Sequence, residues 1–445
     1  MSHYKPYPVY KDSGVEWLGQ VPEHWQVMAI KHVVAIPVTD GPHETPDFLD
    51  SGVPFVSAEA VSSGKINFDK IRGFISKADH ERYSQKYLPK RGDIFMIKSG
   101  ATTGVTAIVE TDAEFNIWSP LAVIRCNEGS NPYFVLNFMR SRSFQEAVAL
   151  NWSYGTQQNI GMGVIGSLSV TVPPVEEQQS IAVHLDRETA RIDALVEKKT
   201  RFVELLREKR QALITHAVTK GLDPNVKMKD SGVEWLGDVP EHWAVCKLSF
   251  RYSVELGKML DEKKLTKTSL VSYLRNQDVQ WGAINTQDLP EMDIHPAELE
   301  RYTVREGDLM VCEGGDVGRA AIWRGESSVF GYQKALHRLR PRSQDNDTAE
   351  FFFFSLLTAK KRGVFEESDS KATIAHLPAE KFRQYRFAFP PTLEQREIAQ
   401  HVRVECERLD VLLTKTELSI ELLKERRSGL ITAAVTGQID LREAA

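Results

Sequence analysis

Two stretches of the chain carry apolar residues at seven-residue spacing, the pattern of a long helix with one narrow apolar face. The repeating positions are Leu185, Ile192, Lys199, Leu206 and Leu213 in the first stretch, and Val402, Leu409, Thr416, Leu423 and Leu430 in the second. Each stretch follows a Pro-Pro pair and is nearly free of Gly and Pro. We therefore predict long helices over residues 174–219 and 391–436, each on the order of 60 Å at ~1.5 Å per residue.

A narrow apolar seam on so long a helix needs a partner, and the other long helix is the obvious one. The intermediate positions Val196, Val203, Leu413 and Ile420 complete each seam. A parallel pair would require residues 220–228 to return the full length of the rod, whereas nine residues span ~30 Å at most. We therefore expect an antiparallel coiled coil. Lys199 and Thr416 interrupt the seam at equivalent places, where they either fix the register or extend to solvent.

The remaining segments, 1–173 and 229–390, mix short apolar runs with Gly, Pro, Asn and Asp. The expected strands are Val53–Val56, Asp93–Ile97, Leu121–Ile124 and Asp308–Val311, and the expected helices are Tyr133–Ala149 and Glu350–Arg362. These patterns indicate two α/β domains and an overall α+β fold, with the strand order open. Residues 437–445 form a tail.

The two halves of the chain are copies of one another. Residues 11–27 and 229–245 read KDSGVEWLGQVPEHWQV and KDSGVEWLGDVPEHWAV. The similarity continues through the strands, the Pro-Pro pairs and the ends of both helices. A repeat of this length is a whole domain with its connector rather than a solenoid unit, so two related domains in a pseudo-twofold arrangement are expected.

Composition is that of an ordinary soluble protein: 445 residues, 42% of them hydrophobic, and a net charge of -5. The four cysteines lie far apart without a CxxC pair, which favours a cytoplasmic location and gives no sign of a zinc site. No signal peptide or membrane span is expected. Basic residues are nevertheless concentrated locally, nine against four acidic residues in 65–98 and six against one in 319–342. Such clusters suit a polyanion such as DNA.

Together these motifs resemble the specificity subunit of a Type I restriction-modification system, and the similarity covers nearly the whole chain. The resemblance rests on four motifs: the WLGxVPxHW entry, the GD[IL] strand with its Gly-rich turn, the PPxxEQ helix start and the ELLxEKRxxLIT helix end. The resemblance implies two target-recognition domains, each of which reads half of a split double-stranded DNA sequence. It also implies that the coiled coil sets the spacer and docks two methyltransferase subunits, to which two restriction subunits attach.

The same resemblance assigns the chemistry to the partners. S-adenosylmethionine would bind the methyltransferase subunits, and ATP and Mg would bind the restriction subunits, with no cofactor or metal on this chain. The assembled complex would be a site-specific deoxyribonuclease and N6-adenine methyltransferase.

The residues themselves indicate where DNA would be read. Gly-rich turns follow an apolar strand at residues 98–104 and 312–319, and such turns bring polar groups close to a phosphate or a base edge. Two further pairs of segments match between the halves, residues 154–159 with 368–373 before the last strand, and residues 118–119 with 332–334. Gln and Asn in them can pair with adenine, and Lys can pair with guanine. The candidate DNA contacts are Lys98, Ser99, Thr102, Thr103, Trp118, Ser119, Tyr154, Thr156, Gln157, Gln158, Asn159, Glu313, Asp316, Arg319, Tyr332, Gln333, Lys334, Ser370, Lys371 and Thr373, with Lys86, Lys90, Arg338 and Arg340 as phosphate ligands.

Other interpretations of these segments remain open. The turns could be ordinary hairpins, and the flanking loops could be solvated. The segment 39–46 resembles a loop of the family without a role that chemistry can assign, and the second half shows nothing comparable. Trp17, Trp235 and the pairs His24-Trp25 and His242-Trp243 are interpreted as structural anchors against the helix ends.

No enzyme motif is convincing. Asn131-Pro132-Tyr133-Phe134 resembles the NPPY motif of adenine methyltransferases. It lacks the second proline, and it suits a helix start, where Asn caps and Pro fits the first turn. Neither a GxxxxGK[ST] loop nor an HExxH motif occurs. We therefore expect a non-catalytic chain.

The two halves differ most at the candidate reading loops, so the expected DNA target is asymmetric and bipartite. A protein adaptor with two ligand-binding ends on a rod is the alternative from another class. A DNA reader without methyltransferase partners is the second alternative, and an apolar stripe outside the seam would argue against it. Ile181, Ala182, Phe202 and Ile398 are the candidates for that stripe.

Overall fold

The computed structural model describes residues 4–154, 158–260, 268–325, 329–366 and 376–442. The chain divides into two compact units. Unit 1 contains Met1–Thr200 and Glu417–Ala445, and unit 2 contains Arg201–Thr416. Each unit therefore holds one α/β domain together with a segment of each long helix, as the expected α+β class requires.

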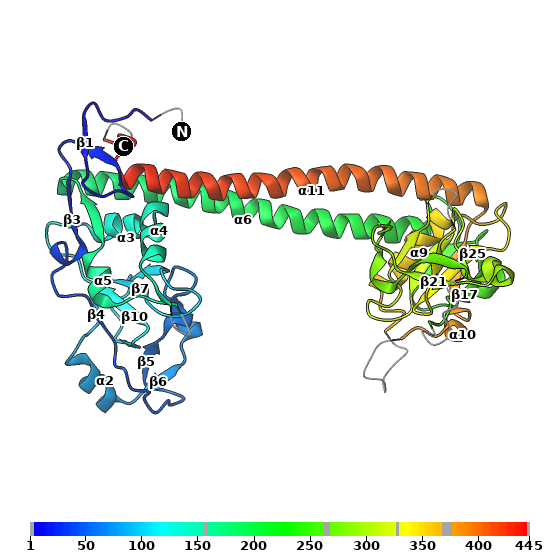
Figure 1. Ribbon diagram of the computed structural model, residues 1–445, viewed down its shortest axis with the longest axis horizontal. Helices are drawn as coiled ribbons and strands as arrows, with labels where there is room; N and C mark the ends of the chain where they lie inside the picture. Colours follow the sequence, from blue (N-terminus) through cyan, green and yellow to red (C-terminus); the bar gives the residue numbers. More distant parts are fainter. Residues whose placement is uncertain (1–3, 155–157, 261–267, 326–328, 367–375, 443–445) are drawn as a thin grey trace. The chain divides into compact units, whose positions relative to one another are not determined.

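Figure 1 labels some of the elements along the chain. Unit 1 contains β1 (Tyr10–Asp12), β2 (Gln20–Pro22), β3 (Gln26–Ala29), β4 (Thr39–Asp40), β5 (Val53–Val56), α1 (Ala58–Val61), β6 (Gly73–Ile75), α2 (Lys77–Ser84), β7 (Ile94–Ile97), β8 (Thr106–Ile108), β9 (Asn116–Ile117), β10 (Leu121–Ile124), α3 (Pro132–Arg140), α4 (Arg142–Leu150), β11 (Ser153–Tyr154), β12 (Gln158–Asn159), α5 (Met162–Ser167), β13 (Ser169–Val172) and the first part of α6 (Val175–Lys220). Unit 2 contains β14 (Met228–Asp230), β15 (Asp238–Pro240), β16 (Ala244–Lys247), α7 (Leu248–Arg251), β17 (Tyr252–Leu256), β18 (Leu270–Leu274), β19 (Val279–Gln280), β20 (Ala283–Ile284), β21 (Glu291–Asp293), α8 (Leu299–Tyr302), β22 (Leu309–Cys312), β23 (Ala320–Ile322), β24 (Gly331–Tyr332), β25 (Leu336–Pro341), α9 (Ala349–Lys361), α10 (Ala379–Phe382), β26 (Arg386–Phe389) and the first part of α11 (Thr392–Val435).

The two domains share one strand order. A four-stranded sheet runs β4-β10-β7-β8 in unit 1 and β17-β25-β22-β23 in unit 2. A three-stranded sheet runs β6-β5-β9 in unit 1 and β21-β18-β24 in unit 2, and its last pair is parallel in both. The sequence repeat is therefore a repeat of topology, and equivalent residues can be compared between the units.

The helix start at Asn131 settles the NPPY resemblance. The side chain of Asn131 accepts hydrogen bonds from the backbone N–H groups of Tyr133 and Phe134, and Pro132 is the first residue of α3. This confirms the capping interpretation. The prediction of one helix over Tyr133–Ala149 is wrong, because the chain is extended at Ser141, whose hydroxyl caps the separate helix α4.

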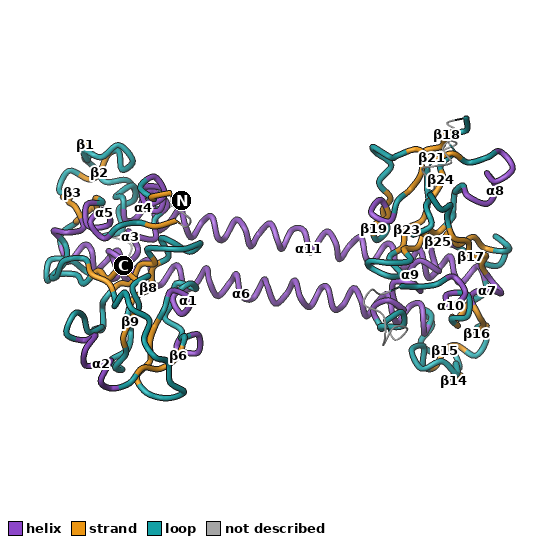
Figure 2. Tube along the Cα trace, turned by 60° about the horizontal axis from the view of Figure 1, so that its bottom comes forward, coloured by secondary structure: helices purple, strands orange, loops and turns teal. Residues whose placement is uncertain are grey.

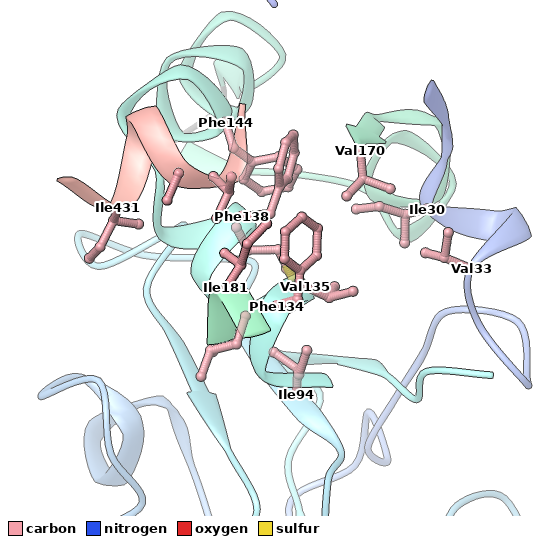
Figure 3. Close-up of a cluster of buried hydrophobic side chains, with 14 of the residues drawn as sticks. Ile30, Val33, Ile94, Phe134, Val135, Phe138, Phe144, Val170, Ile181 and Ile431 are labelled. Carbon is pink, nitrogen blue, oxygen red and sulfur yellow. The ribbon is translucent and has the colours of Figure 1, made fainter. Parts of the chain in front are cut away.

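The largest core of unit 1 joins the domain to both long helices. Phe134 and Phe138 from α3 and Phe144 from α4 pack with Ile181 of α6 and Ile431 of α11, all at most 2% exposed (Figure 3). Burying these five side chains removes apolar surface from water, and this stabilises the folded state by about 25 cal/mol per Å² of buried apolar area. The helix segments are thus part of the domain core rather than a separate rod.

The long helices are antiparallel within each unit. In unit 1, Thr171, just before α6, donates to the carbonyl of Val435 near the end of α11, and Asp193 pairs with Arg427 at 2.8 Å. In unit 2, Arg210 pairs with Asp410 at 3.2 Å. Asp193 and Arg210 of α6 occupy the same repeat positions as Asp410 and Arg427 of α11. The two ion pairs are therefore equivalent.

The predicted seam faces the partner helix or the domain core. Leu185, Ile192, Leu206, Val402, Leu409 and Leu430 are buried, and Leu213 and Leu423 are partly buried. Thr416 is buried, and its hydroxyl donates to the carbonyl of Leu412 in its own helix. Lys199 is partly buried.

The glutamate at the third position after each Pro-Pro pair, Glu177 or Glu394, anchors its helix to the entry motif. The buried Glu177 accepts hydrogen bonds from the Tyr7 hydroxyl at 2.6 Å and the Trp25 indole at 3.1 Å, and its other oxygen lies 2.8 Å from His24. Glu394 accepts from the Trp243 indole at 3.0 Å and lies 2.7 Å from His242. The anchor role predicted for the His-Trp pairs is confirmed.

None of the helices in the described ranges combines the length and the apolar character that a membrane crossing needs.

Candidate DNA-recognition interface

In unit 1, backbone hydrogen bonds bring three of the predicted segments together. The turn after β7 is held against β12, because Gly100 N–H donates to the carbonyl of Gln158 and Ile160 N–H donates to that of Lys98. On its other side, Lys98 N–H donates to the carbonyl of Pro120. The segments 98–103, 118–119 and 158–159 are therefore neighbours, although they are far apart in sequence.

The segment 39–46 belongs to the same surface. Ser119 N–H donates to the carbonyl of Pro42, and Gly41 is so close to the backbone of Ile117 that an added Cβ would lie 2.1 Å from its oxygen. Only glycine fits there. The expectation that the second half lacks a counterpart is wrong. An added Cβ at Gly257 would lie 2.3 Å from the backbone oxygens of Tyr332 and Gln333.

A buried carboxylate organises the basic residues of this surface. Asp40 is fully buried, with Lys86 at 2.6 Å, Lys98 at 3.2 Å and His43 at 3.0 Å. Burial opposes ionisation, but hydrogen bonds from the two lysines outweigh it and hold the pKa of Asp40 below its ordinary value. Asp40 therefore fixes where both ammonium groups sit, a role that the sequence alone did not reveal.

Unit 2 repeats this convergence with different residues. Glu313 N–H donates to the carbonyl of Ala335, Leu377 N–H donates to that of Glu313, and Lys334 N–H donates to that of Lys258. The turn 313–319, the segment 332–334 and the strand-like residues after 375 are thus neighbours. A cavity of about 290 Å³ lies among Lys258, Glu313, Gln333 and Lys334.

Several predicted contact residues hold the turns in place. Arg319 donates to the backbone and side-chain oxygens of Asn276, both at 3.0 Å. Asp316 accepts from the indole of Trp281 at 3.1 Å, and Thr103 donates to the carbonyl of Gly100. In unit 1, the Arg72 guanidinium lies 4.8 Å from the Trp118 ring. Asn276 and Arg72 carry no sequence signal, because their partners are distant in the chain.

Three predicted contacts of unit 2 make their hydrogen bonds inside the domain, and their assignment to DNA is corrected. Tyr332 is fully buried, and its hydroxyl donates to the carbonyl of Arg301. Arg338 is 5% exposed and donates to the carbonyls of Glu300, Arg301 and Thr303. Arg340 forms a two-bond ion pair with buried Asp308. These hydrogen bonds are made within the domain, so the three side chains stabilise it instead of holding phosphates. The side chains of Glu313 and Thr103 are also buried, since these residues are 6% and 9% exposed.

The remaining candidates keep accessible polar groups. Thr102, Asn159, Lys334 and Lys90 are exposed, and Ser99, Ser119, Gln158 and Gln333 are partly exposed. Tyr154 lies in β11. Thr156, Gln157, Ser370, Lys371 and Thr373 fall outside the described residues. The accessible set is polar and partly basic, which suits contact with base edges and phosphates.

Comparison with known proteins decides the family. The family model described as the Type I restriction modification DNA specificity domain matches residues 22–204 and again residues 252–414. The chain belongs to this family. Each match covers one α/β domain with most of the long helix segment that follows it, in keeping with the internal repeat.

Relatives of this family align over most of the chain. A Methanocaldococcus jannaschii chain assigned as the MjaX specificity subunit of a type I restriction enzyme is 23% identical, covering 96% of both chains. The EcoKI specificity subunit of Escherichia coli is 24% identical over 66% of this chain and 62% of its own. The HsdS subunit from Thermoanaerobacter tengcongensis has the same fold, with a TM-score of 0.57, 15% identity and coverage of 94% and 98%.

A chain from a structure of type I R-M complex assembly and conformational transition is more similar, with a TM-score of 0.70 at 15% identity, covering 94% of this chain and 99% of that one. The chain is thus a DNA specificity subunit of a type I restriction-modification system, with two target-recognition domains. Within the described ranges, no group of three His, Cys, Asp or Glu residues is placed to hold a metal ion.

One buried histidine makes the stability of the second target-recognition domain depend on pH. His337 is fully buried in β25, its Nε2 lies 2.7 Å from the carbonyl oxygen of Leu377, and burial lowers its pKa to about 4. The unfolded chain therefore binds the proton first, so stability is complete above the ordinary pKa of 6.5 and is lost as the pH falls from there toward 4.

We expect unit 2 to lose up to roughly 3 kcal/mol across this window, at about 1.4 kcal/mol per pKa unit. Urea unfolding between pH 7 and 4.5 measures it, with His337→Gln as the variant that should lose the dependence. Unit 1 carries Ala122 at the equivalent position and provides the internal control. The same dependence in His337→Gln would contradict the assignment.

Proposed function

We propose that each target-recognition domain reads one half of an asymmetric, bipartite DNA site, and that the two long helices set the spacer between the halves. The observation that best supports this proposal is that the two domains share one strand order but have different residues in their equivalent turns. Ser99-Gly100-Ala101-Thr102 follows β7, whereas Glu313-Gly314-Gly315-Asp316 follows β22. Identical domains would suit a palindrome, whereas these two present different donors and acceptors.

We infer that the chain is not catalytic and that it serves in the cytoplasm as the scaffold of a larger complex. Two methyltransferase subunits dock on the long helices and bring S-adenosylmethionine. Two restriction subunits attach to them and bring ATP and Mg. The chemistry of the bound cofactors stays on the partners, while this chain selects the DNA sequence.

Exposed apolar residues on the long helices support docking. Phe202 and Leu205 of α6 are 45% and 46% exposed, and Leu418 and Leu422 of α11 are 59% and 55% exposed. Apolar surface of this kind is typical of protein interfaces. Of the residues expected to form this stripe, only Phe202 is exposed. Ile181, Ala182 and Ile398 are buried against the domains and are corrected.

The experiment that tests the function is methylome sequencing of a host that carries the methyltransferase partner, with and without this chain. A split, asymmetric adenine-methylated motif that appears only with the chain supports the proposal and gives both half-sites. A palindromic motif would contradict the reading of different halves by the two domains. If no new motif appears although the partner methylates DNA, the adaptor alternative gains ground.

The reading loops can be tested by single substitutions. We expect Lys98→Ala and Arg319→Ala to lower DNA affinity and change sequence preference, because both residues hold turns of the interface. Lys334→Ala should weaken binding evenly across sequences and lower the salt slope by about one, as loss of one phosphate contact does. Fluorescence anisotropy against a salt series measures all three.

The exposed Arg142 of α4, which pairs with Glu146, is the matched control. Arg142→Ala should leave affinity and preference unchanged. Unchanged affinity and preference in both Lys98→Ala and Arg319→Ala would refute the assignment of these turns.

The spacer is tested by helix length. Four residues added to one long helix would lengthen it by ~6 Å at ~1.5 Å per residue, comparable to two base pairs of DNA at ~3.4 Å each. We expect a methylated motif with the same half-sites and a longer gap. An inserted helix that methylates the original spacing would refute the ruler role.

A further inference from the structure

Unit 2 contains a cavity of about 310 Å³ that the DNA-reading surface does not use. It lies where the start of α9, the end of β23 and the first turns of α11 meet, and Figure 2 shows α9 beside β23. Its floor is apolar and consists of Ile322, Phe353, Phe354 and Ala399. Phe353 and Phe354 are partly exposed in this cavity, whose volume is large enough to bind one large apolar side chain.

The rim of this cavity is basic. Arg324, Arg396 and Arg403 line it and are exposed, and Glu350 is the one acidic side chain among the lining residues that the structure describes. Arg324 contacts Glu350 at 3.3 Å, and Arg403 donates to Gln400. Three guanidinium groups against one carboxylate leave a net positive rim. Arginine at such a rim binds carboxylates through two parallel hydrogen bonds.

The equivalent surface of unit 1 has the opposite charge. The residues at the two helix starts are equivalent, because the side chain of Gln178 accepts a hydrogen bond from Asn131 N–H as that of Gln395 does from Thr348 N–H. Gln179 and Asp186 therefore correspond to Arg396 and Arg403. Glu110 follows β8 as Arg324 follows β23. All three counterparts are exposed.

The cavity is also separate from the DNA-reading turn of its own domain. The turn 313–319 leads from β22 into β23, which begins at Ala320 and ends at Ile322. Arg324, on the cavity rim, follows the opposite end of that strand. The basic rim is therefore not explained by the half-site. A phosphate backbone would use the arginines but would leave the apolar floor empty, whereas a protein segment uses both.

We propose that this cavity binds an acidic segment of the methyltransferase partner, with a large apolar side chain on the phenylalanine floor and Asp or Glu side chains on the arginine rim. The inference rests on the proposed function, since it names how that partner docks. The same acidic segment meets Glu110 and Asp186 on unit 1. Two copies of one partner are thus bound with unequal affinity, and the tighter copy is on unit 2.

The test exchanges the rim for the residues that unit 1 carries. The variant Arg324→Glu, Arg396→Gln and Arg403→Asp in the full chain is mixed with methyltransferase subunits, and native mass spectrometry over a salt series gives the two affinities. For the wild type we expect two unequal, salt-dependent affinities. In the variant the tighter one should weaken by at least about tenfold, in the range for charge pairs at interfaces. The reciprocal variant Glu110→Arg, Gln179→Arg and Asp186→Arg should strengthen the weaker one.

The other outcomes overturn the inference in distinguishable ways. Equal wild-type affinities, or affinities unchanged in a variant whose thermal unfolding matches the wild type, would refute the cavity as the docking site and leave the proposed function intact. Weakened DNA binding by the variant complex with unchanged subunit affinities would assign the rim to DNA instead. If the wild-type chain binds no methyltransferase subunit, both this inference and the proposed function fail.

Discussion

Replacing Glu177 by alanine should destabilise unit 1 by about 3–5 kcal/mol, the cost of removing one member of a buried charged hydrogen-bond network. The side chain of Glu177 is 6% exposed, and its carboxylate accepts hydrogen bonds from the Tyr7 hydroxyl and the Trp25 indole and pairs with the ring of His24. Two of these partners are buried aromatic side chains, and without the carboxylate their polar hydrogens have no acceptor. Urea unfolding followed by circular dichroism measures the loss.

Glu394 provides a matched control in the same chain. It occupies the equivalent position, but its side chain is 26% exposed against 6% for Glu177, and it has two of the three partners. We expect Glu394→Ala to cost about 1–2 kcal/mol, because water can replace part of what is lost. Equal losses for the two variants would show that burial does not set the strength of this anchor.

Arg340→Ala should also destabilise the protein by about 3–5 kcal/mol, because it leaves the buried carboxylate of Asp308 without its cation. Two nitrogens of Arg340 lie 2.7 and 2.6 Å from the Asp308 oxygens, and this carboxylate is 2% exposed. Unit 1 contains the same pair, Arg125 and Asp93, so Arg125→Ala should have a comparable effect. The main result is therefore lost stability rather than a lost phosphate contact.

Two measurements separate these roles. Thermal unfolding should show a large shift for Arg340→Ala and almost none for Lys334→Ala, whose side chain is exposed. The salt slope of DNA binding should show the reverse for material that is still folded. A stable Arg340→Ala protein with a salt slope reduced by about one would restore Arg340 as a phosphate ligand.

The sequence by itself determined the architecture. Seven-residue spacing placed α6 and α11 to within a residue or two, because a helix that buries one stripe must repeat its apolar positions along its length. The internal repeat fixed two related domains, and the length of the linker fixed antiparallel helices, which both units show. The family followed from ordered motifs that the fold reuses twice.

The tertiary structure alone decided which polar residues are available. Arg338 and Arg340 resemble phosphate ligands in the sequence. In the structure Arg338 donates to backbone carbonyls of α8, and Arg340 pairs with the buried Asp308 just before β22. Asp40 and Asn276 gave no signal, since their partners are distant in the chain and a local pattern cannot show them. The opposite charges of Arg403 and Asp186 also became meaningful only once the cavity beside Phe353 was seen. Periodicity reports which face is buried, whereas the use of each charge depends on contacts between distant segments.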